Sequence, residues 1–133
     1  MPQNDGPVTL LVVDDEEAVC NALRKFLVQQ GFEVATASSG EEALLTLQRQ
    51  KITGMLLDVN MPGISGVDLV PQIMEIEPTI ALLMLTAVND ATSAALCMQR
   101  GAYDYLIKPI DLGHLSRAIH HALQRRHTQL ESQ

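Results

Sequence analysis

Five short apolar segments, separated by stretches with helical periodicity, constrain the fold of this chain more than any other feature of its sequence. The segments are VTLLVV (8–13), FEVATA (32–37), GMLLD (54–58), TIALLML (79–85) and YDYLI (103–107). Three of them are almost uninterrupted in apolar character, as is typical of strands that are buried on both faces. Strand, helix and strand, repeated along a chain, form a parallel sheet with right-handed crossovers and helices on both faces. We therefore expect a doubly wound α/β fold with a five-stranded parallel sheet and five helices.

The stretches between the strands carry signals for where helices begin and end. The second helix is expected to begin near Ser39, because Ser39 and Glu42 have the spacing of a capping box. Gly31 and Gly101 are expected to end the first and fourth helices. The first and fifth helices each carry an apolar stripe at intervals of three and four residues, formed by Ala18, Val19, Ala22, Leu23, Phe26 and Leu27 and by Leu112, Leu115, Ala118, Ile119, Ala122 and Leu123.

Pro71 conflicts with a regular third helix. A helix that begins near Ser65 should already have completed a turn at this position. An interior proline removes a backbone hydrogen bond and clashes with the preceding turn. We therefore predict a late start or a kink in the third helix.

Length and charge limit the function classes. The chain has 133 residues, which fit one domain with a real core. Its formal charge of −7 argues against direct contact with nucleic acid or an anionic membrane surface. No apolar run reaches the ~20 residues of a membrane helix, and the N-terminus lacks the pattern of a signal peptide, so a cytoplasmic location is expected. Cys20 and Cys97 are interpreted as reduced packing residues.

Polar side chains follow four of the five expected strands, at the point where each strand ends. These are Asp14 and Asp15, Asp58, Thr86 and Lys108. The carboxyl ends of parallel strands meet at one edge of the sheet, where ligands bind in open α/β folds. Each residue has an ordinary alternative, as a helix cap, a turn residue or a surface lysine. All of these alternatives together would require four coincidences at one edge, so we expect a functional site.

The chemistry of this set favours phosphoryl transfer. Carboxylates ~4 Å apart repel by about 4 kcal/mol at an effective dielectric constant of 20, so the three aspartates require a proton or a cation. Carboxylate oxygens suit Mg²⁺, which commonly bridges to a phosphate. Asp58 is the best candidate nucleophile because it ends the middle strand, and Asp14 and Asp15 suit metal binding. Lys108 and Thr86 could neutralise and hold the oxygens of a moving phosphoryl group.

With these motifs the chain resembles the receiver domains of two-component response regulators. The resemblance rests on VVDDEE (12–17), LLDVNMPGISG (56–66), MLTA (84–87) and YDYLIKP (103–109), and it covers about residues 8 to 124. It implies a flavodoxin-like sheet with strand order 2-1-3-4-5. It also implies a phosphoprotein of two-component signal transduction or a phosphorelay, in which Asp58 accepts a phosphoryl group from a phosphohistidine. The donor would be a sensor histidine kinase or a histidine phosphotransfer protein.

The resemblance further implies roles for individual residues. Mg²⁺ would be held by Asp14, Asp15, Asp58 and the backbone carbonyl of Asn60, and Lys108 and Thr86 would contact the phosphoryl oxygens. In the switch, the Thr86 hydroxyl would move toward the phosphoryl group and Tyr105 would turn inward. The Lys108–Pro109 peptide bond would be cis. The alternative interpretation of Tyr105, as a strand aromatic packed on the fourth helix, remains open.

The domain boundaries and the output follow from the same resemblance. We expect a disordered segment over residues 1–7, the receiver domain over 8–125, and a helix extension or a linker to an output domain over 126–133. The face of the fourth helix, fifth strand and fifth helix would change on phosphorylation and form at most a weak homodimer. Such a domain is not an enzyme beyond its own phosphorylation and dephosphorylation. Two alternatives stay open: an interaction module that is not phosphorylated, and a Mg²⁺-dependent phosphohydrolase with an aspartyl phosphate intermediate.

Overall fold

Five parallel strands and five helices alternate along the chain, as the apolar segments predict. The computed structural model describes residues 7–132. The strand order is β2-β1-β3-β4-β5, so the predicted flavodoxin-like topology is confirmed. In chain order the elements are β1 (Thr9–Val13), α1 (Glu17–Gln29), β2 (Glu33–Ala37), α2 (Gly40–Arg49), β3 (Gly54–Asp58), α3 (Gly66–Ile76), β4 (Ala81–Thr86), α4 (Ala91–Arg100), β5 (Asp104–Ile107) and α5 (Leu112–Glu131).

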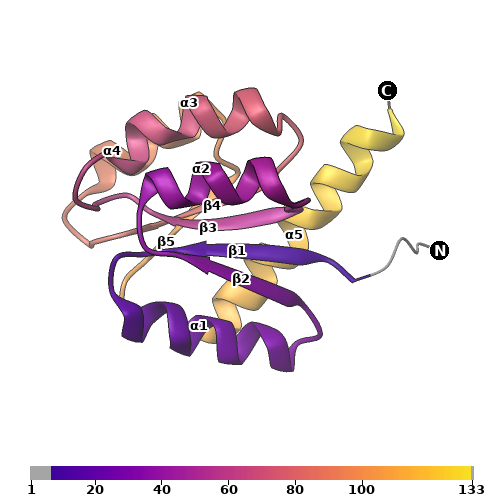
Figure 1. Cartoon of the computed structure of the whole chain (residues 1–133), viewed down its shortest axis with the longest axis horizontal. Helices are drawn as coiled ribbons and strands as arrows, with labels where there is room; N and C mark the ends of the chain where they lie inside the picture. Colours follow the sequence, from indigo (N-terminus) through magenta and orange to yellow (C-terminus); the bar gives the residue numbers. More distant parts are fainter. Residues whose placement is uncertain (1–6, 133) are drawn as a thin grey trace.

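The sheet separates two apolar cores (Figure 1). Helices α2, α3 and α4 cover one face, and α1 and α5 cover the other. Successive side chains of a strand point to opposite faces, so Leu11 and Val13 of β1 belong to the first core, whereas Leu10 and Val12 belong to the second. All four side chains are buried, which explains why the strand sequences are continuously apolar instead of alternating.

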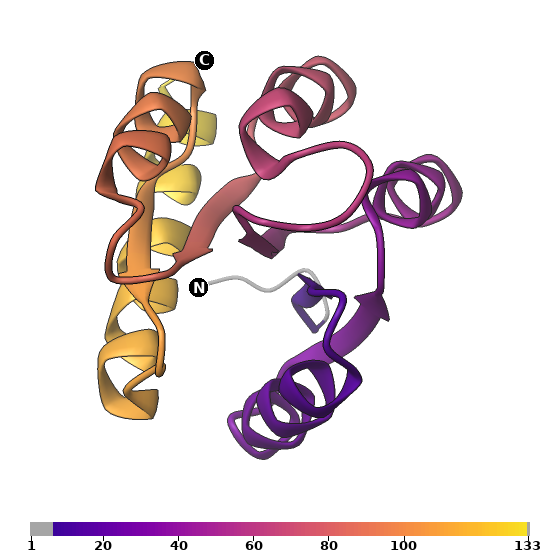
Figure 2. The ribbon, with the colours of Figure 1, turned by 90° about the vertical axis from the view of Figure 1, so that its left-hand side faces the viewer.

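The register of the sheet aligns the carboxyl ends of its central strands. Val13 of β1 pairs with Leu57 of β3, Asp58 pairs with Leu85 of β4, and Thr86 pairs with Ile107 of β5. The residues that follow these pairs therefore emerge at one edge of the sheet. Figure 2 views the molecule from this edge, with helices on both sides of the strands.

Most of the predicted helix ends are found where the sequence signals place them. The Ser39 hydroxyl accepts a hydrogen bond from the Glu42 amide at 3.1 Å. The return bond of the predicted capping box is displaced by one residue, because Glu42 Oε1 accepts from the amide of Ser38. Gly101 follows α4 with φ of 130°, and Gly31 lies one residue beyond the C-cap of α1 with φ of 98°, both in the left-handed region that glycine tolerates.

Of the two alternatives predicted for the third helix, a late start or a kink, the late start is wrong, because α3 begins at Gly66 and continues through Pro71 to Ile76. Pro71 has no N–H to donate to the carbonyl of Val67, four residues earlier. That carbonyl instead accepts a hydrogen bond from Arg100 Nη1 of α4 at 3.0 Å. The same guanidinium lies 3.6 Å from the Asp68 carboxylate. A side chain from the neighbouring helix thus satisfies the group that the proline leaves unpaired.

The two ends of the chain fall partly outside this description. Of the segment predicted to be disordered over residues 1–7, residues 1–6 lie outside the described residues. At the other end, α5 continues as one helix beyond its apolar stripe to Glu131. Within residues 7–132, none of the helices combines the length and the apolar character needed to cross a bilayer.

Candidate functional site

Three carboxylates gather at the carboxyl edge of the sheet, at the ends of the neighbouring strands β1 and β3. One ligand oxygen from each of Asp14, Asp15 and Asp58 lies within 4.8 Å of the other two. Asp14 is 0% exposed and Asp58 is 5% exposed, whereas Asp15 faces solvent. The convergence that the sequence predicts for these three side chains is therefore present.

Lys108 lies between the two buried carboxylates. Its Nζ donates to Asp14 Oδ2 at 2.9 Å and to Asp58 Oδ2 at 3.2 Å. The backbone amide of Lys108 donates to the carbonyl of Thr86 at 2.8 Å, which fixes the start of the connection after β5. The Lys108–Pro109 bond is cis, as the resemblance implies. The ammonium thus acts as an internal counterion for two acids that are far from it in sequence.

The remaining oxygen of each buried carboxylate is fixed by a backbone amide. Asp14 Oδ1 accepts from the amide of Glu16 at 2.9 Å, and Asp58 Oδ1 accepts from the amide of Asn60 at 3.1 Å. In both cases the amide lies two residues after the acid, as in Asx turns. Both carboxylates are therefore held in place before any ligand binds.

Burial dominates the protonation equilibrium of the candidate nucleophile. Desolvation raises the pKa of Asp58, the hydrogen bond from the Asn60 amide lowers it, and the charge of Asp14 raises it again. Lys108 lowers the same pKa, but the net direction is upward. For Lys108, burial alone would lower the pKa, but the hydrogen bond to Asp14 and the charges of both acids outweigh burial and raise it. Lys108 therefore stays charged while it contacts the two carboxylates.

The loop after Asp58 is closed at its base by a glycine. The amide of Gly66 donates to the carbonyl of Val59 at 2.8 Å. A Cβ atom at position 66 would lie 2.7 Å from the carbonyl oxygen of Asp58 and 2.8 Å from the Cα of Val59. Only glycine allows the first turn of α3 to pack this closely on the end of β3. Sequence reasoning did not single out Gly66, although it lies within the motif that follows Asp58.

Thr86 and Tyr105 do not contact the carboxylates in this structure. The Thr86 side chain is 1% exposed, and its hydroxyl donates to the carbonyls of Ala87 at 3.3 Å and Asp90 at 3.4 Å. The hydroxyl therefore faces the loop between β4 and α4. Tyr105 is half-buried and packs against the core beneath α2, α3 and α4.

A contact that sequence reasoning missed connects two loops of the site. Asn60 Nδ2 donates to Asp90 Oδ2 at 2.7 Å. Asp90 immediately precedes α4, and an aspartate before a helix is a signal that the sequence does contain. Nothing in the sequence indicates that its partner would be Asn60.

The donor set of the acidic cluster fits a hard divalent cation. All the donor atoms are oxygens, and the exposed Asp15 leaves a side open to water. Mg²⁺ binds oxygen at about 2.1 Å, so opposite ligands of an octahedral ion are about 4.2 Å apart. The three ligand oxygens, all within 4.8 Å of one another, lie close enough for small side-chain movements to gather them around one such ion. Asp14, Asp15 and Asp58 are therefore suitable ligands for Mg²⁺.

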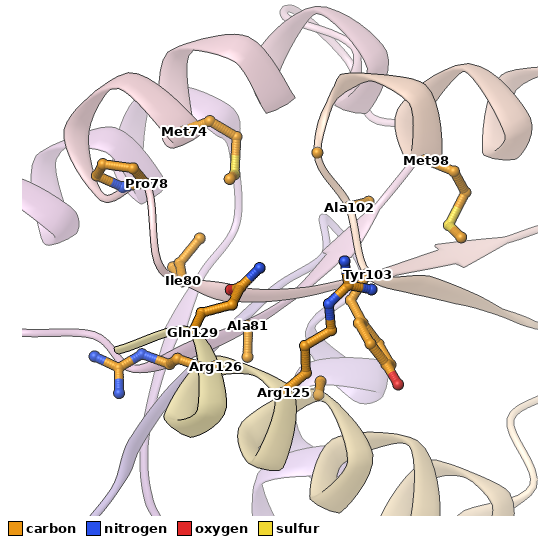
Figure 3. Close-up of a pocket in the computed structure, with 12 residues that line it drawn as sticks. Met74, Pro78, Ile80, Ala81, Met98, Ala102, Tyr103, Arg125, Arg126 and Gln129 are labelled. Carbon is orange, nitrogen blue, oxygen red and sulfur yellow. The ribbon is translucent and has the colours of Figure 1, made fainter. Parts of the chain in front are cut away.

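Two hollows flank the sheet at opposite ends. An apolar groove of about 650 Å³ lies beside Lys108 and is lined by Ala18, Val19, Ala22, Leu23, Pro109, Ile110 and Leu112. A second cavity of about 310 Å³ lies beneath the other end of the sheet, where Arg125 stacks 5.5 Å from the centre of the Tyr103 ring (Figure 3). None of the residues predicted for the site lines this second cavity. Of these two, the groove is the one that adjoins the acidic cluster, through Lys108.

Comparisons with known proteins agree with the geometry. A family model described as "Response regulator receiver domain" matches residues 10–120. The transcriptional regulatory protein ZraR of Escherichia coli K12 is 35% identical over 121 residues, which are 91% of this chain and 27% of that protein. The chain thus spans about a quarter of the length of this relative.

Solved structures give the same result. A response regulator receiver domain protein from Clostridium thermocellum aligns with a TM-score of 0.87 at 35% identity, over 92% of this chain and 98% of that one. NtrX from Brucella abortus, solved in complex with ADP, aligns with a TM-score of 0.91 at 26% identity, over 96% of this chain and 29% of that one. The family match covers most of the chain, and the structural matches extend to its full fold.

Proposed function

The chain belongs to the response regulator receiver domains, which are signalling domains, and from this premise we propose that Asp58 accepts a phosphoryl group from a phosphohistidine in a Mg²⁺-dependent reaction. The observation that carries the proposal is the position of Lys108, whose ammonium contacts Asp58 and Asp14 together. A cation at this position can neutralise negative charge that develops on a phosphoryl group next to Asp58.

In the proposed reaction an oxygen of Asp58 forms a bond to phosphorus. The bond between phosphorus and the donor imidazole nitrogen breaks, and its electron pair stays on that nitrogen. Lys108 would contact a phosphoryl oxygen, and the amide of Asn60 would keep the carboxylate oriented for attack. Asp14, Asp15, Asp58 and the backbone carbonyl of Asn60 would hold Mg²⁺, which when bound supplies charge neutralisation on the phosphoryl oxygens.

The groove beside Lys108 is the proposed docking site of the donor. Its apolar lining comes from α1 and from the segment after the cis peptide, and Lys108 lies at its rim. A donor helix with an apolar stripe could bind there and present a phosphohistidine to Asp58. We propose a sensor histidine kinase or a histidine phosphotransfer protein as this partner.

We propose that phosphorylation is read on the face of α4, β5 and α5. A phosphoryl group on Asp58 would offer the Thr86 hydroxyl an acceptor that competes with the loop carbonyls it now binds. Movement of Thr86 would vacate space toward which Tyr105 could turn. Residues 8–125 would form the receiver domain, and 126–133 would extend α5 or lead to an output domain, as the greater length of ZraR suggests. In the cytoplasm, the receiver would at most dimerise weakly, and nucleic acid would be bound only by the output domain.

Intact mass measured after incubation with acetyl phosphate and Mg²⁺ tests this function. The native chain should gain one phosphoryl group, and the gain should disappear in EDTA and in Asp58→Asn. Asp68→Asn, on the exposed surface of α3, is the matched control and should be phosphorylated like the native chain. No gain with any donor would favour the interaction module, and steady donor hydrolysis without accumulation would favour the phosphohydrolase.

A further inference from the structure

Asp90 accepts hydrogen bonds from two parts of the site, the loop after β3 and the end of β4. Its carboxylate accepts from the Asn60 side chain at 2.7 Å, and its backbone carbonyl accepts from the Thr86 hydroxyl at 3.4 Å. Its own amide donates to the carbonyl of Ala87 at 3.1 Å. The loop after Asp58 and the loop after β4 are thus joined through one residue.

The Asp90 side chain connects the start of α4 to the loop after Asp58. Asp90 is the N-cap of α4, and its Oδ2 accepts from the Asn60 side chain on the other loop. The carboxylate therefore ties the first turn of α4 to the segment that follows the phosphoacceptor.

Asn60 connects this contact directly to the phosphoacceptor. Its backbone amide donates to Asp58 Oδ1 at 3.1 Å, while its side chain donates to Asp90. The backbone carbonyl of Asp90 in turn accepts from the buried Thr86 hydroxyl at 3.4 Å, beside the carbonyl of Ala87 at 3.3 Å. A single chain of hydrogen bonds therefore runs from Asp58 through Asn60 and Asp90 to Thr86.

We propose that Asp90 is a positioning residue that keeps the unphosphorylated receiver in its resting arrangement by holding Asn60 and the Thr86 hydroxyl together. The proposal rests on the function proposed for Asp58 and adds a restraint on it. When the Asn60–Asp90 bond is broken, the loop between β4 and α4 is freed, and the Thr86 hydroxyl is released more often toward Asp58. A larger fraction of competent molecules raises the rate of phosphorylation in proportion.

Phosphorylation rates of four variants test the restraint. Asp90→Ala and Asn60→Ala should each raise the rate with acetyl phosphate about fivefold, which corresponds to the loss of one net hydrogen bond. The double variant should be no faster than either single variant, because both remove the same bond. Asp90→Asn should stay within about twofold of the native rate, because its amide oxygen can still accept from Asn60. Additive effects, or an Asp90→Asn rate equal to that of Asp90→Ala, would overturn the proposal.

A measurement on the resting protein separates this proposal from the function of Asp58. Without donor or metal, the amide hydrogen of Asp90 should exchange with solvent about fivefold faster in Asn60→Ala than in the native chain, because the loop that holds it is freed. Equal exchange in the two proteins would refute the restraint even if Asp58 is phosphorylated. If Asp58 accepts no phosphoryl group but the exchange rates differ as expected, the function proposed for Asp58 fails and the contact still holds the loop.

Discussion

Replacement of Arg100 by methionine should destabilise the domain through a bond that exists only because α3 contains Pro71. Arg100 Nη1 donates to the carbonyl of Val67, which a residue with an N–H at position 71 would otherwise satisfy. Methionine keeps much of the apolar stem of arginine but has no donor, so the substitution removes the hydrogen bond and the ion pair with Asp68 while largely retaining the packing.

The expected cost follows from the two contacts of the guanidinium. A hydrogen bond from a charged donor contributes about 1.5 kcal/mol, at the low end of its range because the Arg100 side chain is 37% exposed. The ion pair with Asp68 adds at most about 0.5 kcal/mol, since it spans 3.6 Å and the Asp68 side chain is 74% exposed. Arg100→Met should therefore cost about 1.5 to 2 kcal/mol and lower the Tm by roughly 5 °C in a domain of this size.

Urea unfolding of a double-mutant cycle measures the dependence on Pro71. In Pro71→Ala the new N–H can bond the carbonyl of Val67, so Arg100→Met should cost only about 0.5 kcal/mol in that background. The coupling between the two positions should be about 1 kcal/mol. Asp68→Asn isolates the contribution of the ion pair. An equal cost of Arg100→Met in both backgrounds would refute the reasoning, because the guanidinium would then not be compensating for the proline.

Three further perturbations test the energetics of the site. Burial raises the pKa of Asp58 in the folded state, so the folded chain holds this proton more tightly than the unfolded chain, and stability is lost as the pH rises from the unfolded pKa through the folded one. The stability of the native chain relative to Asp58→Asn, measured in urea without divalent ions, should therefore fall as the pH rises above the ordinary pKa of a carboxyl group, and a rise would contradict the sign. Gly66→Ala should cost about 1 to 3 kcal/mol in urea unfolding, because its Cβ would meet the backbone of β3, and an unchanged midpoint would mean that the loop yields. Lys108→Met leaves two buried carboxylates without their cation and should cost about 2 to 3 kcal/mol. Mg²⁺ should raise the Tm of this variant more than that of the native chain, whereas equal shifts would show that Lys108 and the metal do not compete.

The fold was predictable because the five apolar segments indicate how many strands the sheet has and about where each strand begins and ends. β3 begins and ends where GMLLD does, and the register then places Asp14, Asp58 and Lys108 at one edge without further information. The late start predicted from Pro71 was wrong, because the residues of α3 alone do not reveal that Arg100 of another helix donates to the carbonyl that the proline leaves unpaired.

The orientation of side chains within the site was less predictable than their convergence. The sequence indicates that Thr86 ends β4 but not that its hydroxyl faces the carbonyls of the following loop. The same holds for the contact between Asn60 and Asp90. These orientations depend on loop backbones whose conformations are set by long-range contacts, so no periodic pattern in the sequence reports them.

The hydrogen bond between Gly66 and Val59 also has a consequence for how this region tolerates change. It makes the segment from 59 to 66 a closed ring, with Asp58 fixed immediately outside it. Substitutions at the exposed positions of the ring alter the surface that a binding partner contacts, but they leave the number of residues in the ring unchanged. An inserted residue would break the ring, because α3 could no longer start against the end of β3. In protein engineering, the segment after Asp58 should therefore accept substitutions at its exposed positions but not insertions or deletions.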